Sequence, residues 1–210
     1  MVDSQYTYGW TEDRPGSCNY ITPAVVKLLK GMGASRVLDI GSGNGELCQT
    51  LHQEMAIDAV GIEYDADGCR IAREKFPNIP FYNISVYDDP SGLLEKEKPF
   101  DVVVSTEVIE HLFYPAELVR FSASVSVPGA RLILTTPYHG YLKNLALSLT
   151  NMWDHHLDPL WDGGHIKFWS RKTITALLER NGYEVEWFGG VGRVRWLWMS
   201  MVVVARRKSA

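Results

Sequence analysis

Cysteine is scarce in this sequence, and no two cysteines lie close together. The 210 residues contain three, Cys18, Cys48 and Cys69, with no C-x-x-C pair. An odd number of widely spaced thiols favours neither a disulfide framework nor a thiolate zinc site. Free thiols fit a reducing compartment, and the opening residues, MVDSQYTYGWTEDR, carry acids and lack the apolar core of a signal peptide. We therefore expect a cytoplasmic protein.

Long apolar runs and an excess of charge of one sign are missing too. No run approaches the roughly 20 apolar residues of a membrane-spanning helix. The net charge is −4, acidic and basic residues are mixed, and the one basic cluster lies at residues 206–208. These absences predict no membrane span and argue against a nucleic-acid partner bound by charge. They leave the oligomeric state open.

The stretch from Arg36 to Asp65 is the most informative part of the chain. An apolar segment runs into a glycine cluster, then a helix-like span, then a second apolar segment that ends on an acid. This pattern predicts a βαβ unit of a parallel sheet. Gly41, Gly43 and Gly45 allow a tight turn and a close approach of a ligand, which predicts a binding site there.

The glycine spacing indicates what kind of ligand binds. A dinucleotide-binding turn reads G-x-G-x-x-G, whereas here Glu46 occupies the place of the third glycine. A carboxylate at the start of a helix would repel a pyrophosphate, which favours a ligand without phosphates. Glu63, eighteen residues after Gly45, stands where an acid that binds a ribose diol is expected.

VLDIGSGNGEL followed by GIEYD resembles the first two motifs of the class I S-adenosylmethionine-dependent methyltransferases. An NAD-type or ligand-free Rossmann relative is the alternative. The resemblance implies that the glycine loop receives the methionine part of the cofactor, that Glu63 binds both ribose hydroxyls and that Asp88 lies near the adenine amino group. The cofactor-binding residues that it implies are Asp39, Gly41, Ser42, Gly43, Gly45, Glu63, Tyr64, Asp88 and Glu107.

The resemblance implies an α/β fold, a Rossmann-like seven-stranded, mostly parallel sheet of order 3-2-1-4-5-7-6 with helices on both faces. One domain over residues 1–210 is expected, and the 46% apolar fraction fits this. Thr22 and Pro23 predict the cap and first position of a helix that ends at Gly31 or Gly33. Further helices are expected at 66–76, 115–125 and 171–180, and strands at 80–89, 101–105, 130–137, 184–189 and 199–207.

Two segments lie outside this pattern. Residues 1–35 form a cap segment that contains Tyr6, Tyr8, Trp10 and Tyr20. In similar methyltransferases such a segment folds over cofactor and substrate, and covering the edge of the core is the alternative. Residues 138–169 form a lid-like insertion rich in His, Trp and Asp.

Glu107, Glu110 and His111 in TEVIEHL are spaced to project from one face of a helical turn just after the fourth strand. Two carboxylates and an imidazole can hold Mg²⁺ or Mn²⁺, and such a cation acidifies a coordinated hydroxyl. E-x-x-E-H also resembles the metal-binding motif of ubiquinone-biosynthesis O-methyltransferases and of small-RNA 2′-O-methyltransferases, which implies His165 as a fourth ligand. In relatives without metal, the first Glu faces the cofactor pocket and the histidine packs structurally, so both readings stay open.

His111 and His139 are the candidate catalytic residues. His139 follows the fifth strand in TPYHGY, where it could act as a general base, and a turn or capping role is the alternative. His155 and His156 are adjacent and cannot both face one site from a helix.

The sequence thus predicts S-adenosylmethionine-dependent methylation of a small-molecule acceptor, with a hydroxyl as the expected group. An RNA-terminal 2′-O-methyltransferase, an N- or S-methyltransferase of a small molecule and a non-catalytic cofactor-binding subunit are the alternatives.

Overall fold

The predicted βαβ unit is present in the computed structural model, which describes residues 8–208. β1 (Arg36–Ile40), α2 (Glu46–Met55) and β2 (Asp58–Ile62) follow one another, and the two strands pair in parallel. The glycine turn joins the carboxyl end of β1 to α2, so it opens at the edge of the sheet where ligands bind in α/β folds.

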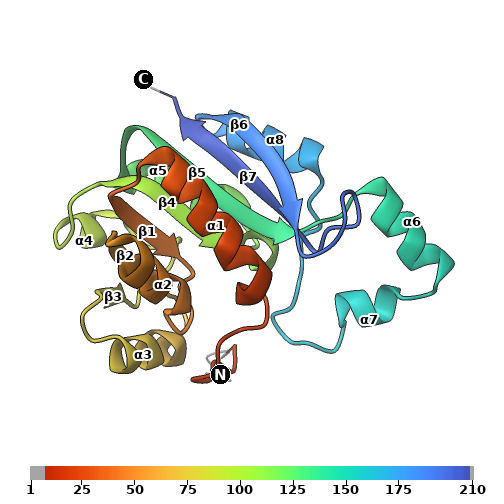
Figure 1. Cartoon of the computed structure of the whole chain (residues 1–210), viewed down its shortest axis with the longest axis horizontal. Coiled ribbons are helices and arrows are strands. Elements are labelled where there is room, and N and C mark those ends of the chain that lie inside the picture. Colours follow the sequence, from red (N-terminus) through yellow and green to blue (C-terminus); the bar gives the residue numbers. More distant parts are fainter. Residues whose placement is uncertain (1–7, 209–210) are drawn as a thin grey trace.

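Seven strands form one sheet of order β3-β2-β1-β4-β5-β7-β6, which confirms the predicted order (Figure 1). β7 runs antiparallel to both of its neighbours, and the other pairs are parallel. The remaining strands are β3 (Phe81–Tyr82), β4 (Phe100–Thr106), β5 (Ser126–Pro137), β6 (Tyr183–Val191) and β7 (Ser200–Arg207).

Helices cover both faces of the sheet because its central strands carry apolar side chains on both faces. On β1, Leu38 and Ile40 pack with α5 and α8, whereas Val37 packs with α1, α2 and α3 on the other face. These helices are α1 (Cys18–Met32), α3 (Ala66–Lys75), α5 (Pro115–Val125) and α8 (Arg171–Arg180), and the short α4 (Ser91–Leu94) adds Leu93 to the first face.

α1 begins earlier than predicted. The helix starts at Cys18, and the Ile21 N–H donates to the carbonyl of Ser17, so Thr22 and Pro23 lie inside the helix rather than at its start. Pro23 therefore supplies no N–H to the helix and leaves the carbonyl of Asn19, one turn earlier, without its helical donor. The predicted end is correct, since Gly33 adopts a left-handed φ of 65° and closes the helix.

β3 is much shorter than the predicted strand over 80–89. After Tyr82, the side-chain amide of Asn83 donates to the carbonyls of Glu63 and Tyr64, at 2.9 and 2.8 Å. Asp88 then closes a turn by accepting from the Ser85 N–H at 2.8 Å. The alternating apolar pattern here therefore belongs to a loop bound to the end of β2.

The insertion contains two helices, α6 (Tyr141–Leu149) and α7 (Trp153–Leu157), which extend beyond the carboxyl end of β5 (Figure 1). Its last part returns to the sheet at Ile166 and Lys167, whose N–H groups both donate to the carbonyl of Glu110. These hydrogen bonds bring the end of the insertion beside the turn that follows β4.

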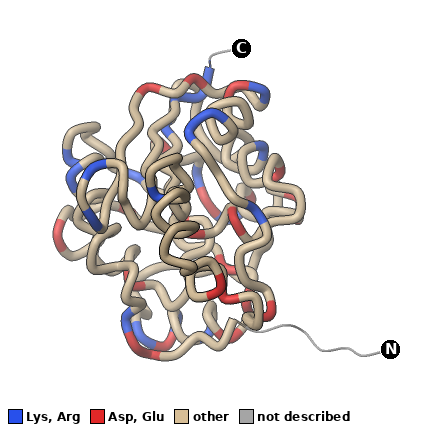
Figure 2. The backbone as a smooth tube through the Cα atoms, turned by 90° about the vertical axis from the view of Figure 1, so that its right-hand side faces the viewer, with Lys and Arg blue, Asp and Glu red and all other residues tan. Residues whose placement is uncertain are grey.

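Among residues 8–208, no helix is long and apolar enough to cross a lipid bilayer. Lys and Arg are interspersed with Asp and Glu along the described chain (Figure 2).

Candidate active site

The glycine turn has a backbone that requires glycine. Gly41 and Gly45 adopt φ values of 76° and 84°, which other residues rarely tolerate. Space is limited as well: a Cβ on Gly41 would overlap Val108, and a Cβ on Gly45 would lie 2.7 Å from the ring of Phe81. Side chains of Val108 and Phe81 thus pack directly against the turn and leave no space for a larger residue at these two positions.

Glu63 lies at the end of β2, directly against the turn, as predicted. Its carboxylate accepts the N–H groups of Gly43 and Asp65, both at 2.8 Å. The side chain is buried, and burial raises its pKa despite these hydrogen bonds. The following Tyr64 is 58% exposed, so its ring is accessible at the edge of the site.

Asp39 and Ser42 are buried polar residues beside the turn. The Asp39 carboxylate accepts a weak hydrogen bond from the Cys48 thiol at 3.6 Å, and its second oxygen has no partner. Burial and then the charge of Glu63 raise its pKa to about 7. The hydroxyl of Ser42 is also buried without a partner, so two polar groups next to the turn are unsatisfied.

Residues 8–13 lie across the glycine turn. The Tyr8 N–H donates to Asp65 at 2.6 Å, and the side-chain amide of Asn44 donates to the carbonyls of Thr11 and Asp13. The ring of Trp10 packs on Gly43 and on Gly68, where a Cβ would lie 2.7 Å from its Cδ1 atom. Tyr6, predicted to belong to the same segment, lies outside the described residues.

Glu107 does not share a helical face with Glu110 and His111, so that prediction is wrong. It adopts a left-handed φ of 54°, and only Ile109–His111 form a 3₁₀ turn, η1. The Glu107 carboxylate instead accepts from the hydroxyls of Thr135 at 2.7 Å and Ser200 at 2.9 Å, and burial raises its pKa. The backbone at Glu107 thus turns its side chain toward β5 and β7.

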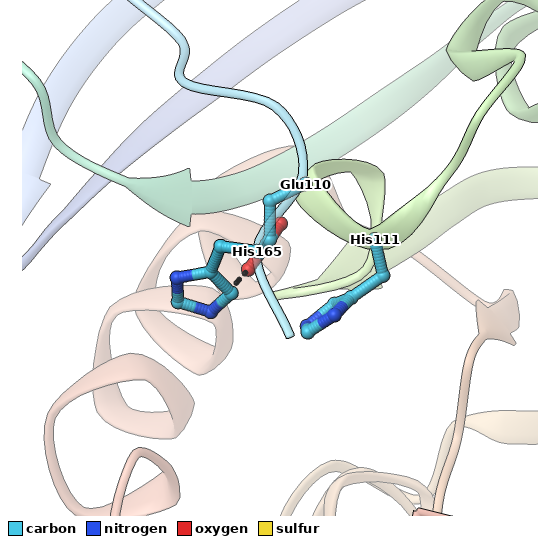
Figure 3. A group of neighbouring side chains, drawn as sticks. All are labelled: Glu110, His111 and His165. Carbon is cyan, nitrogen blue, oxygen red and sulfur yellow. Dashed lines mark ion pairs between the residues drawn. The ribbon is translucent and has the colours of Figure 1, made fainter. Parts of the chain in front are cut away.

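Glu110, His111 and His165 form a compact group (Figure 3). One possible ligand atom from each lies within 4.8 Å of the others, and His165 Nε2 is 3.9 Å from Glu110 Oε1. The first two residues come from the turn after β4 and the third from the end of the insertion. The structure therefore brings together three of the four predicted metal ligands and leaves Glu107 outside the group.

Glu110 is a fully buried acid with an unsatisfied oxygen. Its Oε2 accepts from the Thr136 hydroxyl at 2.9 Å, whereas its Oε1 has no hydrogen-bond partner. Burial and then the charge of Glu107 raise its pKa well above the usual range. A buried carboxylate in this state needs a proton or a cation to balance its charge.

Both histidines of the group are suited to be neutral ligands. His111 Nδ1 lies 2.8 Å from the carbonyl of Gly163 and 3.2 Å from that of Gly164. Carbonyls only accept, so Nδ1 carries the proton and Nε2 keeps its lone pair. Burial lowers the pKa of His111, and burial with neighbouring positive charges lowers that of His165 to about 4.

His139 is buried near the group rather than in it. Its ring contacts those of His156 and Phe168, with centroids 5.3 and 5.1 Å away. Burial, with the charge of Lys143, lowers its pKa to about 4, so it is neutral at pH 7 and a weak base. His155 is exposed while His156 contacts His139, so the two adjacent histidines do face different surroundings. A pocket of about 300 Å³ beside His139 is lined by His139, Asn144, Trp153, Leu157, Phe168 and Ser170.

Several residues of the site were missed from the sequence. The hydroxyls of Thr135, Thr136 and Ser200 orient the two carboxylates, and hydroxyls in strands give no distinctive pattern. Lys143 is buried in the first turn of α6, and its charge acts on His139 and His165. A lone cation among the apolar residues of YLKNLALSL was the signal that could have identified it.

The strand order, the glycine turn after β1 and the acid that ends β2 together define a class I S-adenosylmethionine-dependent methyltransferase. Comparison with known families agrees. The chain belongs to the methyltransferase domain family, which it matches over residues 12–186. The predicted resemblance and cofactor class are therefore confirmed.

Individual relatives are distant. The chain is 27% identical to the mitochondrial ubiquinone biosynthesis O-methyltransferase of Mus musculus over 77% of its own length and 45% of that protein. It is 25% identical to the ubiquinone biosynthesis O-methyltransferase of Alkalilimnicola ehrlichii over 75% of this chain and 67% of the relative. It thus spans about half the length of the mammalian relatives that it matches.

A solved structure shows the same fold with a bound cofactor product. The magnesium protoporphyrin IX methyltransferase of Synechocystis PCC 6803 with bound S-adenosylhomocysteine superposes with a TM-score of 0.63 at 18% identity. The match covers 89% of this chain and 81% of that enzyme. At this identity the likeness bears on the fold alone.

Proposed function

We propose that this protein transfers the methyl group of S-adenosylmethionine to a hydroxyl of a small-molecule acceptor, with a divalent cation held by Glu110, His111 and His165. The observation that carries the proposal is the unpartnered Oε1 of Glu110, buried beside two neutral imidazoles. This donor set of one carboxylate and two histidine nitrogens suits Mn²⁺ better than Mg²⁺, because imidazole nitrogens favour transition metals whereas Mg²⁺ prefers oxygen ligands. The ubiquinone-biosynthesis relatives, named as O-methyltransferases, support the choice of a hydroxyl.

The cofactor would lie along the glycine turn. Gly41, Ser42, Gly43 and Gly45 would hold its methionine part, with the unsatisfied oxygens of Asp39 and Ser42 available to its polar groups. Glu63 would bind the ribose hydroxyls, while Tyr64 and Asp88 would lie on the adenine side. Glu107, which the family resemblance implies as a cofactor-binding residue, is instead held toward β5 and β7 by Thr135 and Ser200.

When bound, S-adenosylmethionine would supply an electrophilic methyl carbon, and the cation would supply a charge that lowers the pKa of a coordinated hydroxyl. The protein side chains would orient the metal ligands and accept the proton of the hydroxyl. Thr136 orients Glu110, and the Gly163 carbonyl orients the His111 ring, so each side chain would offer a free donor atom to a cation between them. His139 is neutral at pH 7 and could accept the hydroxyl proton, although a pKa of about 4 makes it a weak base.

Two segments would exclude water from the reaction. Residues 8–13 already lie over the glycine turn, and the insertion at 138–169 lies beyond the end of β5. We propose that the cap segment over 1–35 and this lid-like insertion complete one methyltransferase domain over residues 1–210. Exclusion of water protects the cofactor and strengthens interactions among charges in the site.

The test is a product assay with labelled cofactor and a panel of hydroxyl, amine and thiol acceptors. We expect S-adenosylhomocysteine and a methyl ether, with turnover lost in EDTA and restored by Mn²⁺ or Mg²⁺. Transfer to amines or thiols alone, unaffected by EDTA, would support the N- or S-methyltransferase alternative and contradict this proposal.

Metal binding needs a measurement that does not depend on turnover. Mn²⁺ titration by electron paramagnetic resonance should show one tight site in the wild type and none in Glu110→Gln. Glu117→Gln, which changes an acid on α5 outside the group, is the matched control and should bind Mn²⁺ normally. Tight binding of S-adenosylmethionine with no product from any acceptor would favour the non-catalytic alternative.

A further inference from the structure

Lys143 is a buried cation that the proposed function does not use. It lies in the first turn of α6 and is 7% exposed. Its Nζ donates to the Met199 carbonyl across 3.4 Å, near the limit of a hydrogen bond. An ammonium has three donors, so among residues 8–208 two of its hydrogens lack a partner. A charged group in this state is costly unless a ligand completes its interactions.

Glu107 does not fill that role. Its charge acts on Lys143, but no ion pair joins the two residues within 4.0 Å among the described contacts. Both hydroxyl partners of the Glu107 carboxylate, Thr135 and Ser200, are already in place. Lys143 is therefore a neighbour of a satisfied carboxylate rather than one half of a salt bridge.

The groups around Lys143 carry more positive than negative charge. Arg193, in the loop between β6 and β7, acts on it as a second cation, and Glu107 is the acid that opposes them. The charge of Lys143 in turn lowers the pKa values of His139, His156 and His165. The ammonium thus acts on His165 of the metal group and on Glu107, the acid held by Thr135 and Ser200.

Lys143 is held in this position by secondary structure. Side chains of a helix lean toward its amino end, which for α6 is the end joined to β5 through Gly140. The carbonyl of Met199 also accepts the Tyr138 N–H at 3.0 Å, which ties the β6–β7 loop to the same place. Burial and Arg193 lower the pKa of Lys143 to about 8, so it is mostly protonated at pH 7.

We propose that Lys143, assisted by Arg193, binds a carboxylate group of the methyl acceptor, so that the substrate is a hydroxylated carboxylic acid. This inference rests on the proposed function, because it names the acceptor class of the same site. Lys143 is a specificity-determining residue here. Its charge would place the acceptor with the carboxylate toward α6 and the hydroxyl toward Glu110, His111 and His165.

The experiment compares hydroxylated carboxylic acids with their methyl esters, which keep the hydroxyl and lose the charge. Calorimetry on the protein saturated with S-adenosylhomocysteine and Mn²⁺ gives the affinity of each member of a pair without turnover. The wild type should bind acids at least about tenfold more tightly than esters, as expected for a charge-assisted hydrogen bond. This preference should fall below about twofold in Lys143→Met and return in Lys143→Arg.

The control is Lys172→Met, which removes an exposed lysine from α8 and should keep the acid preference. Affinity for S-adenosylhomocysteine, measured on every variant, shows whether the fold is intact. Equal affinity for acid and ester, no binding of any acid, or a preference that survives in Lys143→Met would overturn the inference. Methylation of the esters alone would do the same and leave the proposed function standing, whereas bound acids that are never methylated would count against the proposed function instead.

Discussion

Glu63 is hydrogen-bonded to the glycine turn and to the start of α3 through both of its oxygens. The N–H groups of Gly43 and Asp65 hold both of its oxygens, so the carboxylate is fixed in place at the end of β2. A fixed acceptor loses little conformational entropy when it binds a diol. Identification of this residue from the sequence was possible because its distance from the glycines is set by one helix and one strand.

Glu63→Gln should weaken S-adenosylhomocysteine binding about tenfold or more, because an amide cannot accept as many hydrogen bonds as a carboxylate. Isothermal titration calorimetry measures the change. Glu179→Gln on α8 is the control and should bind like the wild type. Unchanged affinity in Glu63→Gln would remove the ribose assignment.

The ionisation of Glu110 can be tested by measuring how protein stability depends on pH. Its pKa in the folded, metal-free protein is raised, so the folded state holds a proton that the unfolded chain releases first. The stabilising effect is complete below the unfolded pKa of about 4.3 and is lost as the pH rises toward the folded value. Glu110→Gln removes this titration while keeping an acceptor for Thr136.

The melting temperature of the metal-free wild type should therefore fall relative to that of Glu110→Gln as the pH rises from about 5 to about 8. Circular dichroism melts at matched ionic strength measure both proteins. A difference that is constant across this range would show that Glu110 ionises as freely in the folded protein as in the unfolded chain, and a change in the opposite direction would show that folding lowers its pKa; either result contradicts the prediction.

At the scale of elements, the strands of the sheet could be predicted and the connections around the site could not. Continuous apolar runs such as FDVVVS define β4, whereas NISV in 83–86 alternates like a strand but binds the end of β2 through Asn83. The turn after β4 also departs from helical geometry at one residue, Glu107. Local pattern cannot reveal either outcome because both depend on contacts with distant elements.

The cap segment gives a prediction at this scale. Alanine has a higher helix propensity than glycine, yet Gly68→Ala in α3 should loosen residues 8–14, because its Cβ would lie 2.7 Å from the Trp10 ring. Hydrogen exchange read by mass spectrometry should show faster exchange over this segment. Gly92→Ala in α4, where a Cβ meets no atom within 4 Å, is the control and should leave it unchanged. Equal protection in both variants would mean that Trp10 does not hold the segment.

At the scale of the whole molecule, binding of the cofactor and binding of the cation should each raise the thermal stability of the folded protein. In our proposal the cofactor would bridge the glycine turn and the end of β2, whereas the three proposed metal ligands join the turn after β4 to the insertion. A ligand at about 100 times its dissociation constant stabilises the folded state by about 2.7 kcal/mol. The melting temperature of the wild type should rise with S-adenosylhomocysteine and, separately, with Mn²⁺.

In Glu110→Gln only the S-adenosylhomocysteine shift should remain, and in Glu63→Gln the Mn²⁺ shift should remain in full. Differential scanning calorimetry gives all of these values on the intact chain. If Mn²⁺ stabilises Glu110→Gln as much as the wild type, the metal binds elsewhere. The order of the strands predicted that the glycine turn, Glu63 and Glu110 lie at one edge of the sheet, because β1, β2 and β4 end there. The proximity of His165 to Glu110 could not be predicted in this way, because it depends on the path of the insertion.

The central claim is that one edge of the sheet holds the cofactor and a divalent cation together. A crystal structure with S-adenosylhomocysteine and Mn²⁺, recorded at a wavelength that gives an anomalous manganese signal, tests it most directly. We predict an anomalous peak coordinated by Glu110 Oε1, His111 Nε2 and His165, with the ribose hydroxyls on Glu63. An ordered cofactor with no anomalous peak among these three side chains would contradict the account.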